Sequence, residues 1–289
     1  MEADIKHTLK KFSLKPVKSL GQNFVTDPWV LEKMTEAAGL DNEDIVLEIG
    51  PGTGSLTAGL AEKAGGVVAV EIDRRLIPVL HEKMKEYPNV HIINADILKL
   101  DIGNILTPYL GEGRRLKVVA NLPYYITTPV IMKLLEERIG AKTMVFMVQK
   151  EVAGRMKAKP GGKDYGALSI AIQYYSEPSV IFDVPPHCFI PRPDVYSSVI
   201  KLEMLDRPRV EVRDEALFFR LVKAAFAQRR KTLANALINA GYFGLDREQT
   251  SIMLSELGIG EKQRGETLTI GQFAQLANYL SNTLNTKKL

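Results

Sequence analysis

The chain has 289 residues, of which 45% are hydrophobic and 25% charged, and its formal net charge is +4. This length is enough for one large domain, or for a large and a small one, with a full hydrophobic core. No apolar run is long enough to span a membrane, the polar and basic N-terminus lacks a secretory signal, and the single cysteine, Cys188, excludes an internal disulfide. We therefore expect a cytoplasmic protein with no membrane association, in which Cys188 is a small buried residue.

Strand and helix patterns alternate from about residue 27 to residue 149. Asp27 followed by Pro28 is typical of a helix start, and Gly39 is typical of its end. Apolar runs predict strands at 45–49, 67–71, 91–94, 118–120 and 143–148. Further helices are expected at 56–63, from Asp73 toward Glu86, and from Thr128. The alternation predicts an α/β fold with a mainly parallel sheet and helices on both faces.

The pattern changes after residue 160. Residues 160–166 predict a flexible loop, and 180–184 and 198–202 predict strands near the end of the sheet. After a linker at 206–208, only helical patterns follow, at about 215–240, 247–257 and 270–280. We expect an α/β domain over 1–205, with a basic, flexible segment at 1–18, and a small all-helical domain over 206–289.

The tetrapeptide Asn121-Leu122-Pro123-Tyr124 follows the expected strand at 118–120. Open α/β sheets keep their ligand chemistry at such strand ends. An amide, a stiffened backbone and an aromatic ring together can hold a flat heterocycle that carries an exocyclic amine. Asn-X-Pro is also an ordinary turn, so the tetrapeptide alone does not settle the function.

A candidate cofactor site precedes the tetrapeptide in the chain. The turn Gly50-Pro51-Gly52-Thr53-Gly54 has G-x-G-x-G spacing, which favours a nucleoside ligand over a dinucleotide or a triphosphate. Glu71 ends the second strand, where it can accept from ribose hydroxyls, and Asp96 follows the third, where it can accept from an adenine amine. Each has an ordinary alternative: a tight turn, a strand end and a turn cap. Their order along the chain resembles that of Rossmann-like class I S-adenosylmethionine-dependent methyltransferases.

Three further motifs narrow the resemblance. They are Ser19-Leu20-Gly21-Gln22-Asn23-Phe24, the F-x-P-x-P-x-V-x-S pattern of residues 189–197, and Ala227-Gln228-Arg229-Arg230-Lys231-Thr232-Leu233. Together they resemble the ribosomal RNA adenine dimethyltransferase family from about residue 19 to residue 280. The third motif is similar to that of its bacterial small-subunit branch.

The resemblance implies that S-adenosylmethionine is the cofactor and that N6 of two adjacent adenosines is methylated twice. These adenosines would lie in a hairpin loop near the 3′ end of small-subunit rRNA, within a preassembled small ribosomal subunit. It also implies cofactor contacts at matching positions: Asn23, Val25, Gly50, Gly52, Glu71, Asp96 and Asn121. Val25 departs from the usual leucine. Asp194 stands where a basic residue is frequent, which puts a local phosphate contact in doubt.

The residues suggest how an adenine amine could be activated. We expect the Asn121 side-chain oxygen and the Leu122 backbone carbonyl to accept the two N6 hydrogens, which would free the nitrogen lone pair for in-line attack. Tyr124 would stack on the flipped base, and Phe189 would cover its other face unless it is a core residue. No metal is expected, because the four histidines do not form a ligand spacing.

Basic residues form three clusters that suit a phosphate backbone. The candidate RNA contacts are Lys18, Arg155, Lys157, Lys163, Arg230 and Lys231. Arg229 falls on the apolar face of the helix expected at 215–240, so it needs an acidic or carbonyl partner, which we expect at the domain junction. The alternative is a chain bend before Arg229 that leaves it solvated.

Other functions remain open from the sequence. A large-subunit rRNA adenine methyltransferase of the antibiotic-resistance type would share the catalytic motifs but would lack the Ala227–Leu233 motif. A non-catalytic RNA-binding assembly factor would have degraded Gly50, Glu71, Asp96 or Asn121, all of which are intact. A small-molecule methyltransferase is disfavoured by the basic clusters. We expect a monomer.

Overall fold

The computed structural model describes residues 1–286, and two compact units are present in it. The first consists of Met1–Ala153 and Glu177–Met204, and the second of Gly154–Ser176 and the chain from Leu205 onward. The last of the three crossings between the units lies between Met204 and Leu205, one residue before the expected domain boundary. Residues 154–176 group with the C-terminal helices. Among the described residues, no helix is both long and apolar enough to cross a bilayer.

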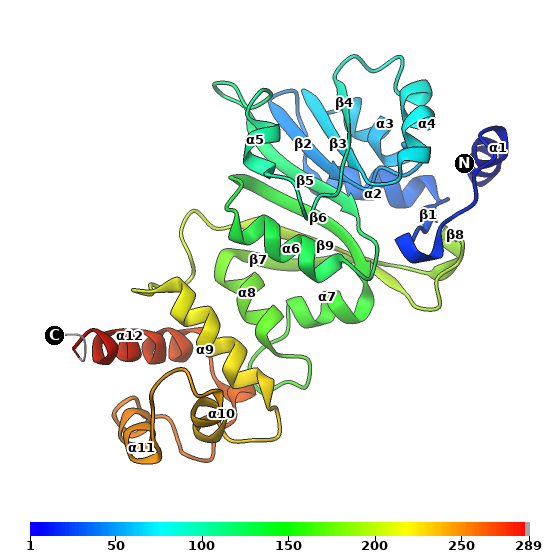
Figure 1. The fold of residues 1–289 in the computed structure, drawn as a ribbon. Helices are drawn as coiled ribbons and strands as arrows, with labels where there is room; N and C mark the ends of the chain where they lie inside the picture. Colours follow the sequence, from blue (N-terminus) through cyan, green and yellow to red (C-terminus); the bar gives the residue numbers. More distant parts are fainter. Residues whose placement is uncertain (287–289) are drawn as a thin grey trace. The chain divides into compact units, whose positions relative to one another are not determined.

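The first unit contains a seven-stranded sheet with strand order β4-β3-β2-β5-β6-β9-β7 (Figure 1). Its strands are β2 (Asp44–Ile49), β3 (Gly66–Glu71), β4 (Val90–Asn94), β5 (Arg115–Asn121), β6 (Ala141–Gln149), β7 (Ser176–Val184) and β9 (Ser197–Met204). Strands β2 to β6 pair in parallel, and β9 pairs antiparallel with β6. The mainly parallel sheet predicted from the sequence is confirmed.

The strand order reverses between β2 and β5. From β2 the chain continues outward through β3 and β4, whereas β5 starts the other half and leads to β6. Because parallel crossovers are right-handed, the helices of the two halves cover opposite faces. The helices of this unit are α1 (Glu2–Lys11), α2 (Pro28–Ala38), α3 (Ser55–Ala61), α4 (Ile77–Lys83), α5 (Ile102–Leu106) and α6 (Thr127–Glu136). The reversal creates a crevice at the carboxyl ends of β2 and β5, where ligands bind in such sheets.

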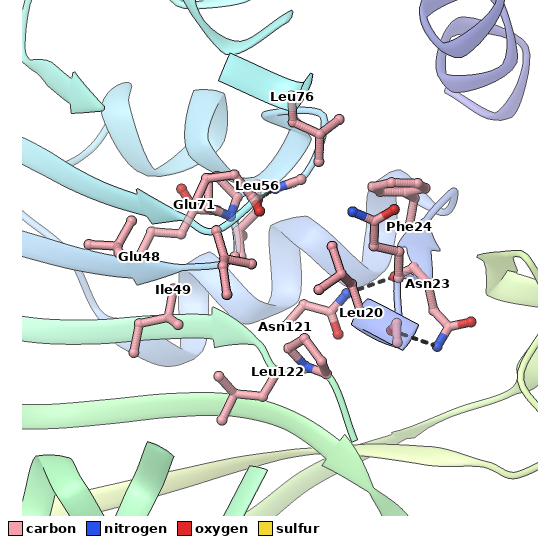
Figure 2. Close-up of a pocket in the computed structure, with 18 of the residues that line it drawn as sticks. Leu20, Asn23, Phe24, Glu48, Ile49, Leu56, Glu71, Leu76, Asn121 and Leu122 are labelled. Atoms are coloured by element: carbon pink, nitrogen blue, oxygen red, sulfur yellow. Dashed lines mark hydrogen bonds between the residues drawn. The ribbon is translucent and has the colours of Figure 1, made fainter. Parts of the chain in front are cut away.

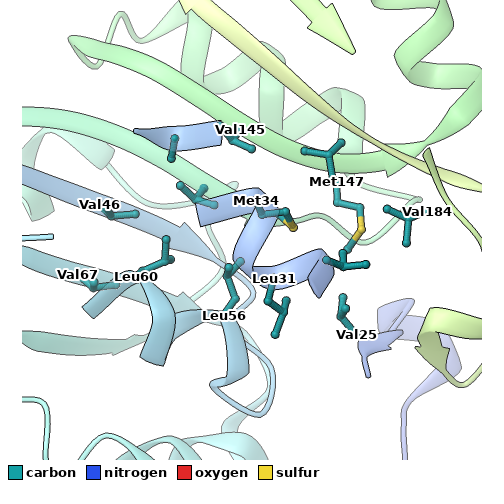
Figure 3. Packing of buried hydrophobic residues seen from close by; sticks show 14 of the residues in the cluster. Val25, Leu31, Met34, Val46, Leu56, Leu60, Val67, Val145, Met147 and Val184 are labelled. Carbon is teal, nitrogen blue, oxygen red and sulfur yellow. The ribbon is translucent and has the colours of Figure 1, made fainter. Parts of the chain in front are cut away.

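Helix α2 anchors the core on one face of the sheet. It begins as its sequence predicts, because Asp27 accepts a hydrogen bond from Trp29 N at 3.0 Å, and it ends at Gly39 with a φ of +58°. Figure 3 shows Leu31 and Met34 of this helix gathered with Leu56 and Leu60 of α3 and with side chains of the strands. The cluster contains Val25, Val30, Leu31, Met34, Val46, Leu56, Leu60, Val67, Val145, Met147, Val184, Cys188 and Phe189. Cys188 is buried, as expected.

The N-terminal segment differs from the flexible one expected. Residues 2–11 form α1, in which Ile5 and Leu9 are buried against Phe24, Leu76 and Val79. The lysines that suggested a solvated segment lie between these apolar positions, so one face of the helix remains free to pack. Spacing of four residues between Ile5 and Leu9 was the available signal.

The second unit is helical, with two differences from expectation. The helix expected at 215–240 is interrupted, giving α9 (Glu215–Ala227) and α10 (Leu233–Ala240), followed by α11 (Arg247–Glu256) and α12 (Ile270–Thr286). Thr232 caps α10, since its hydroxyl accepts from Asn235 N. Helices α7 (Lys150–Met156) and α8 (Ala167–Tyr175) were not predicted, and Tyr174 of α8 stacks on Phe218 of α9 with ring centroids 5.0 Å apart.

Candidate active site

The glycine turn after β2 forms the floor of a pocket at the sheet reversal (Figure 2). Gly50 and Gly52 have φ values of +71° and +60°, a region that residues with a Cβ rarely adopt. A Cβ at Gly52 would lie 3.1 Å from the ring of Phe24. The glycines therefore let the turn approach the segment Asn23–Val25, and all these residues line the pocket.

Glu71 is held rigidly at the end of β3. Its Oε2 accepts a hydrogen bond from Gly52 N at 3.1 Å, and its Oε1 accepts from Asp73 N at 2.8 Å. Burial raises the pKa of this carboxyl above its usual range, and the two backbone donors partly offset that rise. Each oxygen keeps a second lone pair, so the carboxylate can still accept from the hydroxyls of a bound sugar.

Asp96 lines the same pocket after β4. Its Oδ1 accepts from Leu98 N at 3.0 Å, and Lys99 Nζ lies 3.7 Å from its Oδ2. The turn cap that the sequence offered as an alternative is therefore present. It does not exclude a ligand contact, because the carboxylate has further acceptor positions on the pocket wall.

Glu48 is a pocket residue that the sequence analysis missed. It lies inside β2 with 1% of its surface exposed, and burial raises its pKa to about 8. The neighbouring Thr57 hydroxyl partly offsets this rise in pKa. A buried carboxyl in the pocket lining needs further hydrogen-bond partners, which a ligand could supply. A glutamate within an otherwise apolar strand was the signal.

Asn121 lies at the end of β5 with its amide orientation fixed. Its Nδ2 donates to the Asn23 carbonyl at 3.0 Å, so the side-chain oxygen is the group available to accept from a ligand. Figure 2 shows this bond and places Asn121 and Leu122 across the pocket from Glu71. The Leu122 side chain is buried, and its N–H donates to the Met147 carbonyl at 3.2 Å, which holds the backbone of the tetrapeptide against β6.

The half-buried Tyr124 also lines the pocket. Its hydroxyl lies 2.7 Å from Ser197 Oγ, the last residue of the F-x-P-x-P-x-V-x-S pattern. Burial raises the pKa of the Tyr124 phenol, so it stays neutral at physiological pH. The sequence identified the tyrosine and the pattern but not this bond, which joins residues 73 positions apart.

Phe189 does not line the pocket, so the expected contact with the base is corrected. It is 1% exposed and belongs to the core cluster of Figure 3. Its strand β8 (Phe189–Ile190) pairs antiparallel with β1 (Phe24–Val25), with Val25 opposite Phe189. The core alternative is therefore the one observed. The flanking prolines suggested an exposed loop, whereas pairing with β1 turns the ring inward.

Residues 17–25 form an entry segment beside the pocket, and residues outside the expected site hold this segment in place. Gln22 Nε2 donates to Asp73 Oδ2 at 2.8 Å, and Val17 N donates to Gln22 Oε1 at 2.9 Å. Arg75 also pairs with Asp73, which lowers the pKa of that carboxyl to about 2. These bonds hold Asn23 where its carbonyl meets Asn121.

The six candidate RNA contacts are all exposed. Lys18 belongs to the first unit, and the others belong to the second: Arg155, Lys157, Lys163, Arg230 and Lys231. Arg229 is half exposed, because α9 ends before it, yet its guanidinium donates to the carbonyls of Lys163 and Tyr165 and lies 3.4 Å from Glu266. The expected partners and the alternative bend are thus both present, and these partners share the unit of Arg229. In the described part of the chain, no group of three or more metal-ligating side chains occurs.

The chain is similar to known proteins over most of its length. A family model described as ribosomal RNA adenine dimethylase matches residues 14–282. Proteins named ribosomal RNA small subunit methyltransferase A are 51% identical in Alkaliphilus oremlandii, over 96% of each chain, and 51% identical in Shouchella clausii, over 96% of this chain and 93% of the other.

Two crystal structures share the fold. A dimethyladenosine transferase from Plasmodium falciparum is 26% identical with a TM-score of 0.75, covering 92% of this chain and 98% of that one. The 23S rRNA methyltransferase ErmE is 26% identical with a TM-score of 0.66, covering 89% and 99%. The resemblance inferred from the motifs is confirmed, and the chain belongs to the ribosomal RNA adenine dimethylase family.

Proposed function

We propose that this protein dimethylates N6 of two adjacent adenosines in a hairpin loop near the 3′ end of small-subunit rRNA. S-adenosylmethionine would be the methyl donor, and the substrate would be the small ribosomal subunit during its biogenesis in the cytoplasm. The observation that carries the proposal is the fixed Asn121 amide, whose nitrogen is bonded to Asn23 so that its oxygen can accept from an exocyclic amine. Relatives named for small-subunit methylation support the choice of RNA.

The pocket fits the proposed cofactor. Glu71 would accept from the ribose hydroxyls, Asp96 from the adenine amine, and the turn at Gly50 and Gly52 would contact the nucleoside through its backbone. Asn23 and Val25 would close the other side. The buried Glu48 would present a further polar group to the cofactor from the pocket lining. When bound, S-adenosylmethionine supplies an electrophilic methyl group on a sulfonium sulfur.

The residues around Asn121 would prepare the nucleophile. Its Oδ1 and the Leu122 carbonyl would accept the two N6 hydrogens, which localises the nitrogen lone pair and aligns it for in-line attack. Tyr124, held by Ser197, would stack on the flipped adenine. These acceptors would hold N6 in line with the methyl group, so that its bond to N6 would form as its bond to sulfur breaks, and the N6 proton would be released to solvent. In the second transfer only one hydrogen remains, so one acceptor suffices.

Recognition of the particle is assigned to the basic residues. Lys18 would contact RNA from the first unit, and Arg155, Lys157, Lys163, Arg230 and Lys231 from the second. Arg229 would support them by tying the loop at Lys163 to the turn after α9. We place catalysis in the first unit and most of the particle recognition in the second, and we expect the protein to act as a monomer.

The alternative of large-subunit methylation has a specific observation in its favour, the likeness to ErmE. The identity to ErmE is about half that to the small-subunit relatives, 26% against 51%, so the first proposal is preferred.

One experiment separates these functions. The protein is incubated with labelled S-adenosylmethionine and either undermethylated small subunits or large subunits, and dimethyladenosine is mapped by mass spectrometry. We expect two adjacent dimethyladenosines in small-subunit rRNA only. Label in large-subunit rRNA would support the alternative, and no label in either would indicate a non-catalytic assembly factor.

A further inference from the structure

Tyr125 is a pocket residue to which the proposed chemistry gives no role. It follows Tyr124 in the loop between β5 and α6 and lines the pocket, yet 54% of its surface is exposed. Burial of aromatic surface is favourable, so a ligand that covered this ring would gain from the contact. The exposed surface of the ring is therefore available to a ligand.

The ring is held in place by the entry segment. A Cβ built on Gly21 would lie 3.1 Å from Tyr125 Cδ1 and 3.3 Å from its Cε1, so the ring lies directly against the Gly21 backbone. Gly21 has a φ of +58°, which suits glycine. One part of the ring is thus packed, while the remainder stays exposed.

The position of the phenol points to the nucleoside half of the pocket. Burial raises the pKa of Tyr125, and the carboxylates of Asp96 and Glu71 raise it further. Tyr125 lines the same pocket as these two acids, which would hold adenine and ribose. Tyr124 differs, because its hydroxyl is bonded to Ser197 in β9.

We infer that Tyr125 is a cofactor-binding residue whose ring covers the adenosine of the cofactor on its solvent side. The inference rests on the proposed function, since it takes Glu71 and Asp96 as the acceptors for that adenosine. Apolar residues such as Ile72 and Ile97 also line the pocket, and Tyr125 adds an exposed aromatic surface at its mouth. Contact of this ring with the face of the nucleoside would exclude water there.

The test is calorimetric binding of S-adenosylhomocysteine to the full chain without RNA. Tyr125→Ala should lower the affinity about tenfold, the worth of an aromatic contact. Tyr125→Phe keeps the ring and should stay within about twofold of the wild type. Trp29→Ala is the matched control, because Trp29 is 50% exposed in the same unit and packs on Phe182, away from the pocket lining. The affinity of the Trp29→Ala variant for S-adenosylhomocysteine should be unchanged.

A glycine pair tests the support of the ring independently. Gly21 and Gly39 both have a φ of +58°, but a Cβ at Gly39 would meet nothing within 4 Å. Gly21→Ala should weaken S-adenosylhomocysteine binding, because its methyl group would press on the Tyr125 ring and on Pro123 Cβ, 3.3 Å away. Gly39→Ala introduces the same backbone strain and should not.

The outcomes separate the inference from the function on which it rests. If the wild type binds S-adenosylhomocysteine and Tyr125→Ala binds it equally well, the inference is overturned while the proposed function stands. If Tyr125→Ala instead changes only RNA methylation, Tyr125 serves the RNA and the inference is again overturned. If the wild type does not bind S-adenosylhomocysteine, both proposals fail.

Discussion

A single hydrogen bond determines which end of the Asn121 amide faces a ligand. Because Nδ2 donates to the Asn23 carbonyl, the oxygen is presented at the end of β5. A carbonyl can only accept, so the bond also fixes which amide atom is nitrogen. The same bond links the tetrapeptide at residues 121–124 to the entry segment. Loss of Asn121 should therefore affect the reacting amine directly and the segment around Asn23 secondarily.

Asn121→Ala should reduce methyl transfer by about a hundredfold or more, since removal of one aligned polar group commonly costs that much. Binding to undermethylated small subunits should be largely retained, because the exposed basic residues are intact. Methyl incorporation and subunit binding are measured on one preparation. Asn104→Ala, which changes an exposed asparagine of α5, is the control and should behave as the wild type. Equal loss of transfer and binding would contradict the assignment.

Glu48 should make stability depend on pH. Its pKa is about 8 in the folded protein but near 4.5 when unfolded, so the folded state holds an extra proton between these values. Stability should therefore fall as pH rises from about 4.5 to 8, by about 1 kcal/mol per pH unit at the steepest. Glu48→Gln mimics the protonated carboxyl and should flatten this dependence. Urea unfolding of both proteins across this range, without cofactor, checks it. Parallel curves for the two proteins would show that Glu48 is not responsible.

At the scale of helices and strands, the sequence predicted those element boundaries that neighbouring residues determine. The cap at Asp27 and the glycine at Gly39 are read from neighbouring residues, and α2 has the expected bounds. The break between α9 and α10 was expected only as an alternative, a chain bend before Arg229, because residues 228–231 contain no glycine or proline to interrupt the periodicity. The chain there is directed by a distant contact, since Leu233 N donates to the Gln263 carbonyl. Such contacts are not visible in a single sequence.

The residues of the site also fall into two groups, those that local sequence predicts and those that distant contacts place. Its glycine turn, Glu71, Asp96 and Asn121 could be predicted, because each directly follows a recognisable strand and parallel strands end at one edge. Phe189 could not be placed, since which side of β8 faces the core depends on pairing with β1. The contact of Tyr124 with Ser197 likewise depends on how β9 lies beside β6.

Strand β9 offers a matched pair of serines. Ser197 and Ser198 are both buried and point to opposite faces, one bonded to Tyr124 and the other to Asp183 at 2.6 Å. Ser197→Ala should cost about 1–3 kcal/mol of stability, because the half-buried Tyr124 hydroxyl loses this partner. Ser198→Ala should cost about 1 kcal/mol, because Asp183 loses one hydrogen bond but keeps its ion pair with Lys150. Only Ser197→Ala should also lower kcat, since it releases the Tyr124 ring. Thermal unfolding and steady-state kinetics check this. Equal kcat values for the two variants would show that the bond does not position the ring.

Across the whole molecule, the candidate RNA-binding residues are distributed unevenly between the two units, which the net charge does not reveal. A net charge of +4 is modest for an RNA-binding protein, but five of the six candidate RNA contacts belong to the second unit. Within that unit, Gly161 N donates to the Glu266 carbonyl at 2.7 Å, and Arg229 contacts Lys163 and Glu266. The loop around Lys163 and the turn after α9 are therefore held together. The sequence predicted the clusters, but their convergence depends on these distant bonds.

This convergence predicts how particle binding responds to salt. Lys231→Gln should reduce the slope of log affinity against log salt by about 1, because one phosphate contact is lost. Lys33→Gln removes the same charge from α2, where Lys33 pairs with Glu36 outside the basic clusters, and should leave the slope unchanged. Arg229→Gln should lower the unfolding midpoint as well, since it frees the Lys163 loop. Affinity for undermethylated small subunits at several salt concentrations checks the two slopes, and thermal unfolding checks Arg229→Gln. If Lys33→Gln and Lys231→Gln reduced the slope equally, binding would depend on overall charge and not on the surface formed by the second unit.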